Sequence, residues 1–314
     1  MIVLACDLGG TRMKIGVVRD GQLLAQTALP ANSKTGLRPN LPLLKSAWTE
    51  LLTKLNLSVG DCAGISVAFA SLVDPKSGRV LAEYGKYADA MDVDWRAWAR
   101  QEFALPLAIE NDARMALVGE WLAGAGRGCD NLAMITLGTG LGTSAIIEGR
   151  ILRGKHGQAG VLGGHFTVNC GGRKCNCGNV GCAEAEASTV FLRELITARP
   201  DSATSDLART KTLGFDNVFR LAAEGDTCAK AIRDHSLLVW ATLAVNLIHA
   251  YDPEVLIIGG GIMASAEVIL PYIQNYVSQY AHTPWGKVRV KASELGDQAV
   301  FAAAEWLMKE QLTE

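Results

Sequence analysis

Short apolar runs separated by glycine turns open the chain. Residues 2–7, 13–18 and 23–29 each have the pattern of a strand, and Asp20-Gly21 marks a tight turn between the last two. Apolar and β-branched runs joined in this way predict an antiparallel meander. Residues 132–153 repeat the plan, again with glycines and a threonine at the first turn. One copy in each half of the chain indicates an internal duplication.

Helices and strands alternate along the rest of the chain. The hydrophobic pattern predicts helices over 41–57, 95–103, 111–123, 188–222, 227–251 and 298–311, and strands over 62–69, 106–110, 255–262 and 287–293. A further helix is expected between the last two strands. Strands interleaved with helices predict the α/β class with mixed sheets.

The length of 314 residues favours two domains over one core, with a cleft between them. We expect a smaller N-terminal domain over 1–113, completed by a C-terminal helix at 298–314. A larger domain over 114–297 is expected to carry a cysteine-rich loop at 165–182.

Composition argues against nucleic-acid and membrane partners. The formal net charge is −2, so no basic surface is expected. The most apolar stretch, 237–250, is short and contains Asn246 and His249, which indicates a buried helix. Because the first residues lack the basic region and long apolar run of a signal peptide, we expect a cytoplasmic protein.

The first glycine turn carries a candidate phosphate site. It consists of Asp7, Gly9, Gly10 and Thr11, with Lys14 on the following strand. Glycines let backbone N–H groups approach a polyphosphate closely, the threonine hydroxyl adds a donor, and an acid at a strand end can hold magnesium. A plain hairpin, in which Asp and Gly only form the turn, explains the same residues. The motif is too short to decide between the two explanations.

Thr139 and Gly140 occupy the equivalent turn of the second repeat, within GTGLG at 138–142. Thr143 breaks the spacing of a dinucleotide fingerprint, and the turn leads into a strand, which disfavours a Rossmann oxidoreductase. Two such turns in matching places favour a phosphate clamp over two coincidental hairpins. A third glycine turn, at 259–261, either lets the backbone approach a ribose or only connects a strand to a helix.

A carboxylate and an amide follow the strand that ends near Glu110. Asp112 beside a substrate hydroxyl could accept its proton as the oxygen attacks phosphorus. Asn111 offers both a donor and an acceptor to sugar hydroxyls. The alternative is that Asp112 only caps the following helix.

Four ligand-type residues have the spacing of a zinc site. His165, Cys175, Cys177 and Cys182 would complete a closed tetrahedral shell, so the metal would be structural. Cys170 could replace His165 as the fourth ligand. The alternative is a set of buried or redox-active cysteines.

In their order along the chain, DLGGT, END, LGTGLG, GH, CNCGNVGC and IIGGG resemble the ROK family of repressors and sugar kinases. The resemblance covers essentially the whole chain. It implies an actin-like, ribonuclease H-like ATPase fold with a cleft between duplicated domains, the use of ATP, Mg²⁺ and structural Zn²⁺, and a homodimer. It also implies nucleotide contacts at Asp7, Gly9, Gly10, Thr11, Lys14, Thr139, Gly140, Gly260 and Gly261, and sugar contacts at Ser71, Asn111, Asp112, His165 and Glu184. In the family the histidine binds zinc through one nitrogen and a sugar hydroxyl through the other.

Two departures from the family pattern concern the sugar. Members of the family usually have the motif Gly-Glu-x-Gly-His before the zinc site. The corresponding segment here, residues 160–165, contains no acidic residue and is one residue longer. Residues 69–74 replace a Gly-x-Pro-Gly loop. The loss of a charged hydrogen-bond partner would cost about 1.5–3 kcal/mol for an ordinary hexose. We therefore expect an acceptor that differs from plain glucose around C1 or C2.

The sequence predicts an ATP-dependent kinase for a hydroxyl of a hexose or hexose-like sugar, with Asp112 as the general base. A sensor that binds sugar or nucleotide without turnover is the alternative. The missing glutamate favours the sensor, and the retained Asp112 opposes it.

Overall fold

The computed structural model describes residues 1–82 and 85–313, which form two compact units. Of the described residues, the first unit comprises 1–82, 85–127, 153–159 and 295–313, and the second comprises 128–152 and 160–294. The chain therefore passes between the units several times. The domain boundary that the sequence analysis expects after residue 113 stays a prediction.

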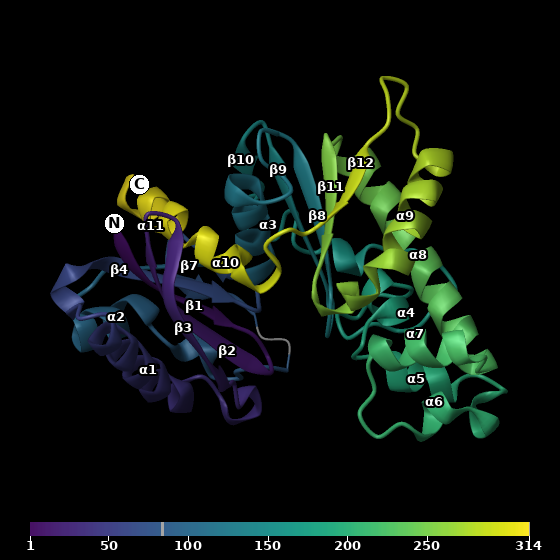
Figure 1. The fold of residues 1–314 in the computed structure, drawn as a ribbon, viewed down its shortest axis with the longest axis horizontal. Coiled ribbons are helices and arrows are strands. Elements are labelled where there is room, and N and C mark those ends of the chain that lie inside the picture. The colour runs from purple at the N-terminus through teal and green to yellow at the C-terminus, as the bar shows by residue number, and fades with distance from the viewer. Residues whose placement is uncertain (83–84, 314) are drawn as a thin grey trace. The chain divides into compact units, whose positions relative to one another are not determined.

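The first unit is built on a five-stranded sheet in the order β3-β2-β1-β4-β7 (Figure 1). Its strands are β1 (Ile2–Leu8), β2 (Arg12–Arg19), β3 (Gln22–Pro30), β4 (Cys62–Phe69) and β7 (Leu107–Asn111). The first three form the predicted antiparallel meander, and β4 and β7 add to it in parallel. A small hairpin of β5 (Val73–Asp74) and β6 (Arg79–Val80) follows β4.

Helices cover both faces of this sheet. Side chains of α1 (Leu41–Lys54) and α2 (Trp95–Phe103) share a buried core with alternate residues of the strands, such as Leu4, Cys6 and Leu8. The helices α10 (Ala299–Ala302) and α11 (Ala304–Thr313) pack on the other face, where Gly16 and Gly64 make room for Phe301 and Met308. The helix α3 (Asp112–Ala123) packs along α10 (Figure 1).

The second unit repeats the plan of the first. Its sheet has the order β10-β9-β8-β11-β12, made of β8 (Leu132–Leu137), β9 (Leu141–Ile147), β10 (Arg150–Ile151), β11 (Val255–Gly259) and β12 (Arg289–Ala292). Three antiparallel strands again precede two parallel ones. The shared strand order is what the predicted duplication requires.

The helices of the second unit are α4 (Ala183–Ala187), α5 (Leu192–Thr197), α6 (Asp206–Arg209), α7 (Phe215–Glu224), α8 (Thr227–Tyr251) and α9 (Ala266–Tyr280). The segment 188–222, expected to be mainly helical, is broken into three short helices. Pro200 disfavours a helical residue before it, and Gly214 caps the start of α7. Within the described part of the chain, no helix has the length and apolarity needed to cross a membrane.

Candidate active site

Three parallel neighbours of the first sheet end at the same edge. Leu8 of β1 pairs with Phe69 of β4, and Phe69 pairs with Asn111 of β7. The carboxyl ends of such strands are where open α/β sheets bind ligands. This register brings Asp7, the glycine turn that follows β1 and the Asn111-Asp112 pair to one edge of the sheet.

The glycine turn after β1 is held by side chains from two later segments. The hydroxyl of Tyr87 donates to the carbonyl of Gly9 at 2.9 Å, and the hydroxyl of Ser33 donates to the carbonyl of Gly10 at 2.6 Å. The backbone N–H of Tyr87 donates to Ser33 O at 2.8 Å, which ties the two supports together. Tyr87 has φ of 54°, a sparsely populated conformation for a non-glycine residue. A backbone fixed in this way is preorganised to bind a ligand with its N–H groups.

Lys14 pairs with acids of its own unit. Its ammonium lies 3.2 Å from Asp7 Oδ2 and 2.8 Å from Asp297 Oδ1. Burial raises the pKa of Asp7, although the Lys14 ammonium opposes the rise. Two carboxylates therefore compensate the charge of Lys14.

Asn111, and not Asp112, is the N-cap of α3. Asn111 Oδ1 accepts from the N–H of Arg114 at 3.2 Å. Its Nδ2 donates at 3.0 Å to both Ser71 O and Asp112 Oδ1. Asp112 is the first residue of the helix, and its Oδ1 also accepts from Ala113 N at 2.8 Å. Asn111 therefore occupies the N-cap position, and Asp112 accepts one further N–H of the first turn.

The environment of Asp112 raises its pKa to about 6. Burial is the main cause, and the negative charge of Asp7 adds to it. The ammonium of Lys86 acts in the opposite direction. A carboxylate that titrates close to neutral pH has the properties of a general base.

A buried ionic network begins at Glu110, directly before Asn111 and Asp112 in the chain. The sequence analysis did not predict it. Glu110 of β7 and Arg114 of α3 are fully buried, four residues apart in sequence, and pair at 3.0 Å. The other oxygen of Glu110 accepts from Arg153 Nε at 2.7 Å. Arg114 Nη2 donates to the carbonyls of Gly157 and Ala159 at 2.9 and 2.8 Å. The network fixes the strand end that carries Asn111 and Asp112, and only the i,i+4 spacing of Glu110 and Arg114 hinted at it.

In the second unit, Glu184 and Gly260 contact the two ends of the glycine turn at 138–140. Glu184 of α4 accepts from the N–H of Leu141 at 2.9 Å, at the end of the turn that contains Thr139 and Gly140. Gly260 has φ of 96°, and a Cβ added there would lie 2.2 Å from Leu137 O, at the start of the same turn. Glu184 and Gly260 therefore both contact the turn that contains Thr139 and Gly140. Glycine at 260 is required by both its conformation and this close approach.

His165, Cys175, Cys177 and Cys182 form one cluster in the second unit. Their ligand atoms all lie within 4.8 Å of one another. Cys177 Sγ is 3.6 Å from Cys182 Sγ, and Cys175 Sγ is 3.5 Å from His165 Nδ1. These separations fit the edges of a tetrahedron with zinc-to-ligand bonds of about 2.0–2.3 Å. Cys170 is exposed and outside the cluster, so His165 is the fourth ligand candidate.

The segment that departs from the family pattern is packed against the second sheet. Val161 is buried, and the hydroxyl of Thr143 donates to Gly160 O at 2.6 Å. A Cβ at Gly164 would lie 2.0 Å from Leu141 O, so the backbone can pass there only as glycine. An apolar side chain therefore stands in this segment, where the family's glutamate was expected and not found.

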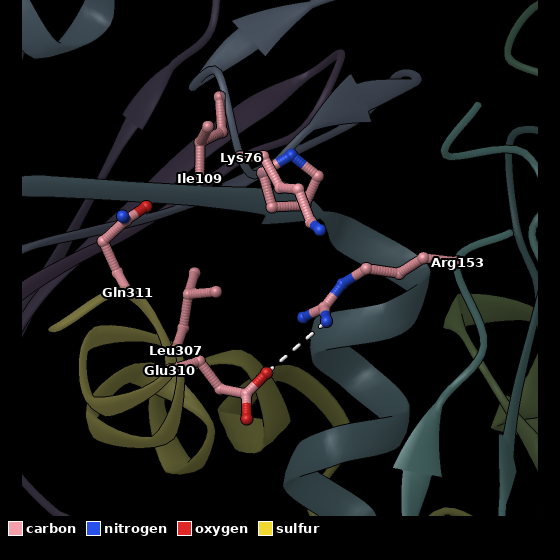
Figure 2. A pocket seen from close by; sticks show the side chains of 7 residues that line it. Lys76, Ile109, Arg153, Leu307, Glu310 and Gln311 are labelled. Atoms are coloured by element: carbon pink, nitrogen blue, oxygen red, sulfur yellow. Dashed lines mark hydrogen bonds and ion pairs between the residues drawn. The ribbon is translucent and has the colours of Figure 1, made fainter. Parts of the chain in front are cut away.

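Two hollows of the first unit are lined in part by residues of the buried ionic network, among them Arg153. Figure 2 shows the smaller, of about 30 Å³, in which Arg153 and Glu310 form an ion pair at 3.4 Å. The larger, of about 520 Å³, shares Pro75, Lys76 and Arg153 with it. None of the site residues expected from the sequence lines either hollow.

The model of the ROK family matches residues 3–311. A protein named glucokinase from Halalkalibacterium halodurans is 28% identical over 97% of this chain and 94% of its own length. A second glucokinase, from Thermotoga maritima, is 30% identical over 99% of this chain and 98% of its own. Among solved structures, a ROK family glucokinase from Streptomyces griseus in complex with glucose and AMPPNP is 26% identical, with a TM-score of 0.78 over 98% of this chain and 99% of its own. This likeness confirms the predicted α/β fold class of two duplicated mixed sheets.

Proposed function

The chain belongs to the ROK family, and from this we propose that it is a sugar kinase that transfers the γ-phosphoryl group of ATP to a hydroxyl of a hexose-like sugar. One observation carries the proposal beyond the family. Asp112, whose pKa is raised to about 6, lies at the same sheet edge as the braced glycine turn after β1. The solved relative that holds glucose and AMPPNP supports the same pairing of sugar and nucleotide.

In the proposed reaction Asp112 acts as the general base. The sugar oxygen forms a bond to the γ-phosphorus while the bond from that phosphorus to the β,γ-bridging oxygen breaks, and ADP leaves with the electron pair. The hydroxyl proton passes to the Asp112 carboxylate. General-base assistance of this kind contributes about 10²–10⁴-fold to the rate.

The nucleotide is assigned to the glycine turns. Gly9, Gly10 and Thr11 are proposed to bind phosphate oxygens, and the family resemblance assigns the same role to Thr139 and Gly140. Gly260 and Gly261 would lie near the adenosine. Asp7 would interact with the magnesium that accompanies ATP, and Lys14, which already pairs with Asp7, would position that carboxylate.

The sugar is assigned to His165, Glu184, Asp112 and the Asn111–Ser71 contact. Both N–H donors of Asn111 are used within the protein, so we propose that it positions Asp112 and offers its oxygen to the substrate. Val161 leaves no carboxylate for the hydroxyls that the family glutamate binds. An acceptor that differs from glucose near C1 or C2 is therefore proposed.

Zinc is proposed to be structural. Three thiolates and one imidazole would close its shell and leave no position for a substrate. Its contribution would be to fold the loop 165–182 and to orient the imidazole of His165.

An acceptor panel tests the function. Folded protein is incubated with MgATP and aldoses, ketoses, amino sugars and N-acylated amino sugars, and phosphorylated products are identified by mass spectrometry. We expect one or a few acceptors to be phosphorylated, and glucose to be a poorer acceptor. Silence across the panel, with sugar or nucleotide binding retained, would favour a non-catalytic sensor.

A further inference from the structure

Lys86 lies along the first glycine turn, in a segment that carries no recognisable motif. A Cβ built on Gly10 would lie 2.6 Å from Lys86 Cε and 3.2 Å from Lys86 Nζ. The hydroxyl of the next residue, Tyr87, donates a hydrogen bond to the carbonyl of Gly9. The backbone N–H of Tyr87 donates to the carbonyl of Ser33, whose hydroxyl in turn donates to the carbonyl of Gly10. The stem of Lys86 is thereby held against the turn that is assigned to the phosphates.

The charge of Lys86 acts on Asp112. Its ammonium is the positive group that lowers the pKa of Asp112 against the effects of burial and of Asp7. Within the described residues, no carboxylate lies at ion-pair distance from Lys86, whereas Lys14 pairs with both Asp7 and Asp297. Of the two lysines beside this turn, Lys86 is the one that makes no direct ion pair with any carboxylate in the part of the chain that the structure describes.

A half-buried cation between a phosphate turn and a general base has a specific use in phosphoryl transfer. Negative charge is spread over the equatorial oxygens of the transferring group, and a fixed cation stabilises it. Lysine binds phosphate as a point charge, which suits a group that changes shape during the reaction.

We propose that Lys86 is a catalytic residue whose ammonium binds the γ-phosphoryl group of ATP between the Gly9-Gly10 turn and the Asp112 carboxylate. The proposal rests on the proposed kinase function. Lys86 donates hydrogen bonds to phosphoryl oxygens throughout and transfers no proton. The same charge keeps more of Asp112 in its ionised form near neutral pH.

Steady-state kinetics with the full-length protein test the first consequence. Lys86→Met is expected to lower kcat by about 10²–10³-fold, somewhat less than the roughly 10³–10⁵-fold that an arginine on the transferring phosphoryl group contributes in GTPases. The KM of the sugar should change by less than about threefold, because the sugar is not the group that Lys86 binds. Lys86→Arg keeps the charge and should retain at least about a tenth of kcat. Lys76→Met, which removes an exposed lysine of the same unit, is the matched control and should be unchanged.

The pH profile separates this role from a structural one. Asp112 must be ionised to act, so activity falls as pH drops through its pKa. Removal of the Lys86 charge raises that pKa, and the acid limb of the Lys86→Met profile should move to higher pH. A wild-type kcat together with an unmoved acid limb would overturn the proposal.

Nucleotide binding tests Lys86 without turnover. Calorimetry with magnesium and either AMPPNP or ADP compares a nucleotide that has a terminal γ-phosphate with one that lacks it. Lys86→Met should weaken AMPPNP at least about tenfold and ADP less than about twofold. If Lys86→Met weakens the binding of AMPPNP and ADP equally, or of neither, the γ-phosphate contact is refuted, even if no acceptor sugar is found. If the expected difference is seen but the wild type phosphorylates no sugar, only the kinase function is refuted.

Discussion

The ionisation of Asp112 should destabilise the folded protein. An aspartate in the unfolded chain titrates at a pKa of about 3.9, whereas burial raises the folded-state pKa of Asp112 to about 6. Between these values the unfolded chain releases the proton first as pH rises, so stability falls over this window and the full cost is present above it. Asp112→Asn should therefore raise the Tm by about 2–5 °C at pH 8 and have little effect at pH 4.

Thermal melts of both proteins at the two pH values measure this difference. Asparagine keeps an Oδ1 that can accept from Ala113 N, so the comparison isolates the charge. A stabilisation of equal size at pH 4 and pH 8 would show that ionisation of Asp112 is not its cause.

The same pKa predicts the pH dependence of catalysis. The carboxylate form is the active base, so the profile of kcat/KM against pH should lose half its value near pH 6 on the acid side. Measurement under conditions where chemistry limits the rate should give this limb. A profile that is flat down to pH 4.5 would show that no group with the raised pKa of Asp112 controls the reaction.

Some residues of the candidate site could be predicted from the sequence, and others could not. The glycine turns and Asp112 carry local signals, because a turn or a strand end needs particular residue types nearby. Lys86 and Tyr87 carry none, since they reach the first turn across more than 70 positions. The cap of α3 was misplaced by one residue, because Asn and Asp are equally good N-caps and only the structure shows which side chain bonds to the helix.

At the scale of elements, the buried pair between β7 and α3 should matter far more than an exposed pair of the same spacing. Arg114→Met leaves the fully buried Glu110 with one partner fewer, and should lower the free energy of unfolding by about 3–5 kcal/mol. Arg220→Met removes one half of an exposed i,i+4 pair and should change it by less than about 0.5 kcal/mol. Urea unfolding of the two variants makes the comparison. Similar losses would mean that burial of the first pair is not what gives it its energetic weight.

The contact of α3 with α10 depends on one glycine. A Cβ at Gly119 would lie 2.0 Å from the carbonyl oxygen of Ala299, and a backbone atom has little freedom to move away. Gly119→Ala should destabilise the first unit by about 1–3 kcal/mol despite the better helix propensity of alanine. Gly60→Ala is the control, because its nearest neighbour would be 3.6 Å away. An unchanged Tm for Gly119→Ala would show that the two helices can separate at little cost.

Element boundaries followed from the sequence where a strong local signal stood at each end. The predicted spans 62–69, 95–103 and 227–251 coincide with β4, α2 and α8. Asp94 and Asp226 cap the two helices, with side chains that accept from Ala97 N and Ala229 N. The segment 188–222 was predicted as mainly helical although it contains Pro200 and Gly214, and the three short helices are separated near these two residues.

At the scale of the whole molecule, duplication was visible in the sequence and governs the architecture. The meander and its glycine turn recur in each half, and each half forms a sheet with the same strand order. The strap 153–159, which belongs to the first unit although its neighbours belong to the second, could not be predicted. It is held by Arg114 and Arg153, whose partners are distant in sequence.

The cysteine cluster should determine the stability of the second unit. Cys177→Ser removes one ligand from a shell of four, so bound zinc should fall well below one per chain and the Tm should drop by several degrees. Cys170→Ser removes a nearby exposed thiol outside the cluster and should keep about one zinc per chain. Metal analysis of the purified proteins, with thermal melts, gives both readouts. A wild type that carries no zinc after preparation without chelators would contradict the site.

In the proposed reaction, Asp112 takes the proton of a sugar hydroxyl while the γ-phosphoryl group of ATP is transferred to the oxygen of that hydroxyl. The most direct measurement is the rate of sugar-dependent ADP formation by the wild type and by Asp112→Asn, with sugar and nucleotide affinities measured on the same samples. We expect a loss of about 10²–10⁴-fold in kcat with affinities within a few fold of the wild type. An Asp112→Asn protein that phosphorylates the sugar at the wild-type rate would contradict it.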